Sequence, residues 1–236
     1  MNTRRKVLLT GAGGFIGHHL VSDLKAQGHW VRGVDLKHPE HAATGADEFS
    51  ISDLREIESC LQASRGIDTV FALAADMGGM GFISQNHSQI FYNNALINLH
   101  TLEAARRNGV ERYLFSSSAC IYPEFLQEDA DVRPLREDDA YPAQPQDAYG
   151  WEKLMSERVA LHYRDDHGID MRIARFITST ARSARGRAGA RRLPRRSAAR
   201  SRLRKRQGIR RLRFGGMANR RARSAISMIA SKGCGG

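Results

Sequence analysis

The stretch Thr10–Gly17, Thr-Gly-Ala-Gly-Gly-Phe-Ile-Gly, constrains the fold of this chain more than any other. It follows the apolar residues 7–9 and opens a segment in which Ile16, Leu20 and Leu24 share one helical face. An apolar run, a glycine turn and an amphipathic helix in that order predict a strand–turn–helix unit with a very close approach between its parts.

The three glycines at the fingerprint spacing have different physical roles. Gly11 allows a tight turn, Gly14 lets backbone N–H groups approach a pyrophosphate, and Gly17 lets the helix pack on the strand. The phosphates would lie at a helix N-terminus, where unpaired N–H groups and the dipole favour negative charge. We therefore predict that the turn binds a dinucleotide, with Phe15 and Ile16 among its contacts.

An acidic residue at the end of the next apolar run strengthens this interpretation. Residues 30–34 lead into Asp35, roughly 20 residues beyond the glycines, where a carboxylate that binds ribose is expected. Such a carboxylate repels a 2′-phosphate, so Asp35 predicts NAD rather than NADP. The alternative is an ordinary α/β turn, because glycine serves those as well.

Short apolar runs alternate with longer segments of helical spacing from about residue 6 to residue 176, which is typical of a doubly wound parallel sheet. The fold class predicted is therefore α/β, with a Rossmann-type sheet. Strands are expected at residues 6–10, 30–34, 68–73, 112–116 and 170–175. Helices are expected at residues 14–27, 53–63, 83–108 and 147–167.

Two strand ends carry further candidate residues, because ligands bind such sheets at the carboxyl ends of the strands. The alanines and glycines within residues 74–81, Gly78 among them, would let the backbone lie close to a cofactor, although a flexible glycine loop is an equal alternative. Residues 116–118 are serines, and Ala119 and Cys120 follow them. Serines also end strands by ordinary hydrogen bonding, and a buried cysteine is usually a small apolar group, so position favours a functional role here.

Tyr149 and Lys153 are four residues apart near the start of an expected helix, so they project from one face. A free phenol with a pKa of about 10 is a poor base at neutral pH. A neighbouring ammonium and a nicotinamide cation would stabilise the phenolate. The spacing therefore predicts a general base at Tyr149, assisted by Lys153.

These pieces together resemble the extended short-chain dehydrogenase/reductases, that is, the NAD-dependent epimerase/dehydratase family. Residues 74–82, 117–125 and 142–150 are similar to those of the GDP-mannose 3,5-epimerases within that family. The Met-Gly-Gly-Met-Gly loop at 77–81 and the cysteine after Ser-Ala are the most specific features. The resemblance covers about residues 4–176.

The resemblance implies that NAD oxidises C4 of a GDP-mannose-type nucleotide sugar, that an acid/base pair then inverts C3 and C5, and that the hydride finally returns to C4, which regenerates NAD. It implies that Tyr149 takes the hydroxyl proton, that Lys153 holds the ribose and the phenolate, and that Ser118 orients the C4 oxygen. Cys120 would be one member of the acid/base pair, and a lysine beyond the resemblance would be the other. The remaining implied contacts are Asp53 and Leu54 with the cofactor, and Gly78, Ser118, Ala119 and Cys120 with the substrate.

Charge divides the chain into two unlike parts. Residues 177–236 contain 19 Lys and Arg residues and no acid, whereas residues 1–176 contain the other 18 together with all 25 acids. The first part, with a net charge of −7, is the predicted NAD-binding domain, residues 1–176. The second, with +19, has few large apolar residues, so disorder is expected there. The substrate domain that the resemblance implies is expected to be missing.

A change of reading frame accounts for this break. When the last base of each codon is taken with the first two of the next, residues 176–182 can be read as His-Asn-Ile-Tyr-Gly-Pro, with which the family continues. The same displacement, started from the last base of codon 227, turns residues 228–233 into a possible Asp-Asp-Cys-Val-Glu-Gly. We therefore expect a one-base deletion at the Phe176 codon, a truncated enzyme and no turnover.

Three alternatives remain open at this level. The chain could be another NAD-dependent nucleotide-sugar epimerase or dehydratase, a catalytically dead regulatory subunit, or an NAD-sensing protein whose basic tail binds nucleic acid non-specifically. The three cysteines have no metal-ligand spacing, so no metal is expected. The absence of a signal peptide and of any membrane-spanning run predicts a cytoplasmic protein, and relatives of this fold suggest a homodimer when full length.

Overall fold

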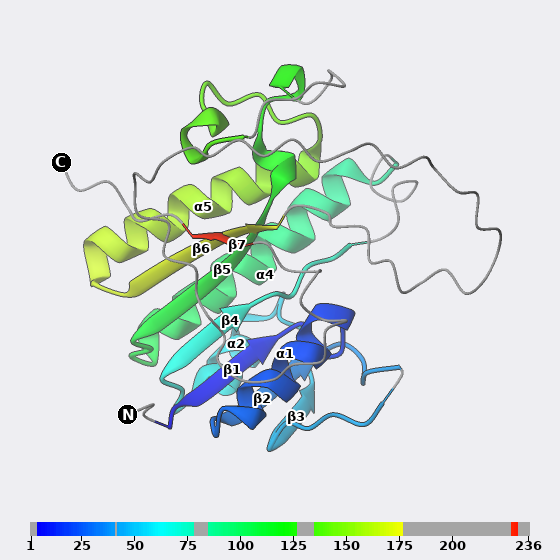
Figure 1. The fold of residues 1–236 in the computed structure, drawn as a ribbon, viewed down its shortest axis with the longest axis vertical. Coiled ribbons are helices and arrows are strands. Elements are labelled where there is room, and N and C mark those ends of the chain that lie inside the picture. The colour runs from blue at the N-terminus through cyan, green and yellow to red at the C-terminus, as the bar shows by residue number, and fades with distance from the viewer. Residues whose placement is uncertain (1–3, 41, 78–84, 127–134, 177–227, 231–236) are drawn as a thin grey trace, which may run out of the picture.

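The computed structural model describes residues 4–40, 42–77, 85–126, 135–176 and 228–230. They form one sheet in the strand order β3-β2-β1-β4-β5-β6-β7 (Figure 1). The first six strands are parallel, and β7 runs antiparallel to β6. The strands are β1 Lys6–Thr10, β2 Trp30–Asp35, β3 Glu48–Ile51, β4 Thr69–Ala72, β5 Arg112–Ser118, β6 Asp170–Phe176 and β7 Met228–Ala230.

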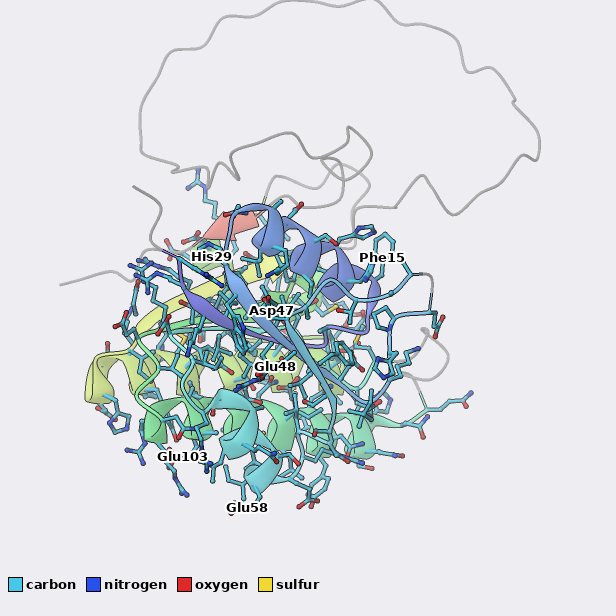
Figure 2. The ribbon with its side chains drawn as sticks, turned by 90° about the horizontal axis from the view of Figure 1, so that it is seen from below. Phe15, His29, Asp47, Glu48, Glu58 and Glu103 are labelled. Atoms are coloured by element: carbon cyan, nitrogen blue, oxygen red, sulfur yellow. The ribbon has the colours of Figure 1, made fainter. Side chains whose placement is uncertain are left out.

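Helices cover both faces of this sheet. They are α1 Phe15–Ala26, α2 Ile57–Ser64, α4 His87–Arg107 and α5 Ala148–His167, with the 3₁₀ turns η1 Ala119–Ile121, η2 Glu124–Leu126 and η3 Glu137–Ala140. Helix α1 lies on one face, whereas α2, α4 and α5 lie on the other (Figure 2). The predicted doubly wound α/β fold is thereby confirmed.

The core consists of two apolar layers, one on each side of the sheet. On one side, Leu20, Val21 and Leu24 of α1 pack on Val7 and Leu9 of β1. On the other side a larger cluster joins α2, α4 and α5 to the sheet. The strand order reverses between β1 and β4, because β2 and β3 follow on one side of β1 and β4 begins the other side. Sheets of this kind bind ligands at such a switch point, outside the carboxyl ends of the strands.

All five expected strands and all four expected helices are present, with three differences. Strand β3 was not predicted, because only Phe49 of its four residues is partly buried and an edge strand needs little apolar sequence. The helix expected from residue 53 begins at Ile57, because Asp53 accepts a hydrogen bond from the backbone of Arg55 and forms a turn instead.

The third difference concerns the basic segment, for which disorder was expected. Residues 228–230 form β7 and pair with residues 174–176, while the rest of 177–236 lies outside the described residues. Within the described part of the chain, no helix is long and apolar enough to cross a membrane. The same residues contain no cluster of three or more His, Cys, Asp or Glu side chains suited to a metal ion.

Candidate active site

The glycine turn between β1 and α1 has the geometry that its sequence predicted. Gly11 has φ +73°, and a Cβ there would lie 2.9 Å from the backbone nitrogen of Ala74. A Cβ on Gly17 would lie 2.1 Å from the carbonyl oxygen of Gly11. Gly14 is the N-cap of α1 and supplies no side-chain cap, so the first-turn N–H groups suit an anion from outside.

Asp35, at the end of β2, faces this turn. Its Oδ2 accepts a hydrogen bond from the Gly13 backbone nitrogen at 2.8 Å, and its Oδ1 accepts one from Leu36 at 2.7 Å. A Cβ on Gly13 would lie 2.2 Å from the carbonyl oxygen of Lys37. Gly13 is therefore a further candidate site residue that the fingerprint spacing missed, although the adjacent glycine pair was a signal for it.

The other expected cofactor contacts follow β1 and β3, at the carboxyl ends of these strands. Phe15 and Ile16 are exposed at the first turn of α1 (Figure 2 labels Phe15). Asp53 pairs with Arg55 through an Nη2–Oδ2 contact of 2.5 Å, and the hydrogen bond from Arg55 lowers the pKa of that carboxyl. The Leu54 side chain is buried in the core, so only its backbone can face a ligand. These roles stay predictions.

Two asparagines of α4 fix the chain just beyond β4. Asn94 Oδ1 accepts from the backbone nitrogen of Asp76 at 2.6 Å, and its Nδ2 donates to the Asp76 carbonyl at 3.2 Å. Asn93 Nδ2 donates to the Asp76 carboxylate at 2.7 Å. Sequence reasoning missed both, and consecutive asparagines on a helix were the available signal. Gly78, the predicted substrate contact nearby, lies outside the described residues.

The end of β5 meets the start of α5. Ser118 Oγ accepts a hydrogen bond from the Cys120 backbone nitrogen at 3.2 Å. Ser118 also lies close enough to Tyr149 to lower the pKa of its phenol. A Cβ on Gly150 would lie 2.2 Å from the Cys120 carbonyl oxygen, so η1 sits directly on the first turn of α5. The structure thus brings together Ser118, Cys120 and Tyr149, and Ala119 lies between the first two.

Tyr149 and Lys153 project from one side of α5, as their spacing predicted. The Lys153 ammonium lies 5.6 Å from the Tyr149 ring centroid and 4.9 Å from that of Phe115. Lys153 is 1% exposed, and its Nζ has no hydrogen-bond partner among the described residues. A buried amine without a partner is costly, so this geometry suits a ligand that brings acceptors to it.

Burial dominates the electrostatics of this pair. It raises the pKa of Tyr149, the charges of Cys120 and Glu152 add to that rise, and the Ser118 hydroxyl opposes it. Burial also lowers the pKa of Lys153, against the charges of Glu152 and Glu157. A phenolate base at neutral pH therefore needs positive charge beyond what these residues supply.

Sequence comparisons agree with this geometry. The model of the NAD dependent epimerase/dehydratase family matches residues 7–222. GDP-mannose 3,5-epimerase of Arabidopsis thaliana is 53% identical over 173 residues, which cover 72% of this chain and 46% of that protein. GDP-mannose 3,5-epimerase 1 of Oryza sativa subsp. japonica is likewise 53% identical over 173 residues, with the same two shares. The chain spans about half the length of these curated relatives.

Solved structures show the same fold. A short-chain dehydrogenase/reductase superfamily protein from Agrobacterium tumefaciens with bound NAD has a TM-score of 0.63 at 28% identity. That match covers 75% of this chain and 50% of the other. The UDP-glucose 4-epimerase of Thermus thermophilus in complex with NAD has a TM-score of 0.61 at 30% identity. That match covers 70% of this chain and 53% of the epimerase chain.

Proposed function

Because this chain belongs to the NAD-dependent epimerase/dehydratase family, we propose that residues 1–176 are the NAD-binding domain of a nucleotide-sugar epimerase of the GDP-mannose 3,5-epimerase type. The observation that carries this proposal is the meeting of Ser118, Cys120 and Tyr149 at one edge of the sheet, with Lys153 buried beside them. Another sugar-nucleotide epimerase of this fold would share the glycine turn, Tyr149 and Lys153 but would not need Cys120, so Cys120 favours the 3,5-epimerase type.

The residues present fit NAD. The turn at Gly11 and Gly17 leaves no room for a Cβ, Asp35 is held beside it, and the buried Nζ of Lys153 lacks a partner within the described chain. The glycine turn would hold the pyrophosphate, Asp35 the adenosine ribose, and Lys153 the nicotinamide ribose. When bound, NAD supplies a hydride acceptor for C4 of the sugar and later returns the hydride.

The chain's own residues then move protons. Tyr149 takes the proton of the C4 hydroxyl, with Lys153 stabilising the phenolate and Ser118 orienting the C4 oxygen. Once C4 is a ketone, the C3 and C5 protons are acidic, and Cys120 exchanges a proton at these carbons. A thiol suits this step because its thiolate can take up a proton and the thiol can give one back.

Residues 177–236 are proposed to be the product of a one-base deletion at the Phe176 codon. This segment contains 19 Lys and Arg residues and no Asp or Glu, which supports the proposed change of frame. The residues that bind the GDP-sugar and supply the second acid/base group would then be encoded in the original reading frame and be missing from this chain. We accordingly propose that the 236-residue polypeptide has no epimerase turnover, and that the frame-restored protein is a cytoplasmic homodimer.

Two matched proteins test this proposal, the chain as given and the product of a gene with one base restored at codon 176. The restored protein is expected to convert GDP-mannose to GDP-galactose, and the chain as given is expected to be inert. A panel of UDP-sugars serves as the control for substrate class. Turnover by the 236-residue chain would contradict the proposed inactivity, and a restored protein that acts only on UDP-sugars would contradict the proposed substrate.

A further inference from the structure

Arg175, near the end of β6, joins three elements around the Cys120 turn. Its Nε and Nη2 donate to the two carboxylate oxygens of Glu157 in α5 at 3.0 and 2.8 Å. Its Nη1 donates to the Tyr122 hydroxyl at 3.1 Å and to the Glu137 carbonyl in η3 at 2.7 Å. The planar guanidinium therefore fixes the relative positions of β6, α5, η3 and the residue that follows η1.

This cluster is buried, so its geometry is strongly constrained. The side chains of Arg175 and Glu157 are 13% and 4% exposed, and Tyr122 is 1% exposed. Burial alone would lower the pKa of Arg175, but the hydrogen bond and charge of Glu157 raise it instead. Arg175 therefore remains charged, and it cannot leave Glu157 without stranding a buried charge.

The cluster and the proposed base share one rigid helix. Glu157 lies eight residues after Tyr149 on α5, which is about 12 Å along the helix axis at 1.5 Å per residue. Both residues are on its buried side. A guanidinium fixed by Glu157 is thus fixed relative to Tyr149.

Tyr122 transmits this constraint to Cys120. Its backbone nitrogen donates to the Ala119 carbonyl at 3.1 Å and closes the turn that contains Cys120. Its ring lies 5.2 Å from the Arg175 guanidinium. On the other side, Gly150 contacts the Cys120 carbonyl. The Cys120 turn is therefore held to α5 from both sides.

We propose that Arg175, anchored by Glu157, is a positioning residue that sets the turn carrying Cys120 against the first turn of α5, which carries Tyr149, by holding Tyr122. The inference rests on the proposed function only for the acid/base role of Cys120. If the ion pair did no more than attach β6 to α5, its loss would lower stability and leave the thiol of the folded protein unchanged.

The test measures alkylation of Cys120 by iodoacetamide, followed by mass spectrometry, in a Cys234→Ser background. Cys60 is an internal control, because it is buried and burial raises its pKa to about 11, so it reacts only when the chain opens. Tyr122→Phe removes the hydroxyl and keeps the ring. Arg175→Met removes the cation, and Arg172→Met is the matched control, since it removes an exposed arginine of the same strand.

We expect Tyr122→Phe and Arg175→Met to raise the Cys120 alkylation rate by about threefold or more and to shift its profile between about pH 6 and 10, with Cys60 still protected. The double variant Tyr122→Phe/Arg175→Met should show the same Cys120 alkylation rate as Arg175→Met alone, because both changes remove the same contact between Tyr122 and Arg175. Arg172→Met should match the parent. A parent-like Cys120 profile in Tyr122→Phe would overturn the inference, even if Arg175→Met does not fold. The assay needs neither NAD nor sugar, so a failure of NAD binding would refute the proposed function separately.

Discussion

Replacing Gly11 with alanine is expected to weaken NAD binding by roughly 100-fold, equivalent to about 2.7 kcal/mol. The new Cβ would lie 2.9 Å from the Ala74 nitrogen and 3.0 Å from the Leu73 carbonyl carbon, both of which are backbone atoms. Backbone cannot rotate away as a side chain can, so the turn itself must move. The N–H groups that face the phosphates would move with it. Calorimetric titration of the folded variant with NAD measures the effect.

Gly28→Ala is the matched control. Gly28 also has a left-handed backbone, with φ +85°, but nothing lies within 4 Å of its added Cβ, and it follows the far end of α1. Both variants suffer the left-handed strain of about 1–2 kcal/mol, so both lose some thermal stability. Only Gly11→Ala should bind NAD more weakly than the parent. Equal NAD affinities in the two variants would show that the glycine turn is not the cofactor site.

Lys153→Met is expected to stabilise the folded chain by about 2 kcal/mol while weakening NAD binding by roughly tenfold. The Nζ of Lys153 is buried and has no partner among the described residues, so an apolar side chain of similar length removes a desolvation penalty. The same change removes the donor proposed for the nicotinamide ribose. Denaturant unfolding and NAD titration measure the two effects on one protein.

This gain in stability should depend on pH, with a sign fixed by linkage. Burial, opposed by Glu152 and Glu157, puts the folded-state pKa of Lys153 below its ordinary value of 10.5. Between those two pKa values the unfolded parent binds more protons than the folded parent, so its stability rises with pH. The advantage of Lys153→Met is therefore full below the folded-state pKa and declines as the pH rises towards 10.5.

Lys25→Met serves as the control, because Lys25 is partly exposed and paired with Asp47 at 2.7 Å. It should change stability by less than about 1 kcal/mol. If Lys153→Met proves strongly destabilising and keeps its NAD affinity, Lys153 is a packing residue and not part of a cofactor site.

Local patterns made much of this molecule predictable from its sequence. Apolar runs gave the strands of the sheet core, and the i, i+4 spacing of Tyr149 and Lys153 placed both on one side of α5 without any tertiary information. The positive φ at Gly11 followed from the requirement for a tight turn. In each case the determining contacts lie within a few residues, so the sequence order alone reveals them.

The features that were missed depend on contacts between distant segments. Asn94 holds Asp76 from another element, and Arg175 meets Tyr122 across 53 positions. Gly150 must be small because the Cys120 carbonyl rests on it, which only the packed structure reveals. Strand β3 was not predicted because its side chains are mostly exposed, so its sequence contains no apolar run. Single-sequence reasoning has no access to such pairings.

The most direct test of the central claim is a calorimetric titration of the purified 236-residue chain with NAD and, separately, with NADP. The account predicts one saturable NAD site and an affinity for NADP that is at least about tenfold weaker, because Asp35 would oppose a 2′-phosphate. A chain that is folded by circular dichroism and yet shows no saturable binding of NAD, or binds both dinucleotides equally, would contradict it.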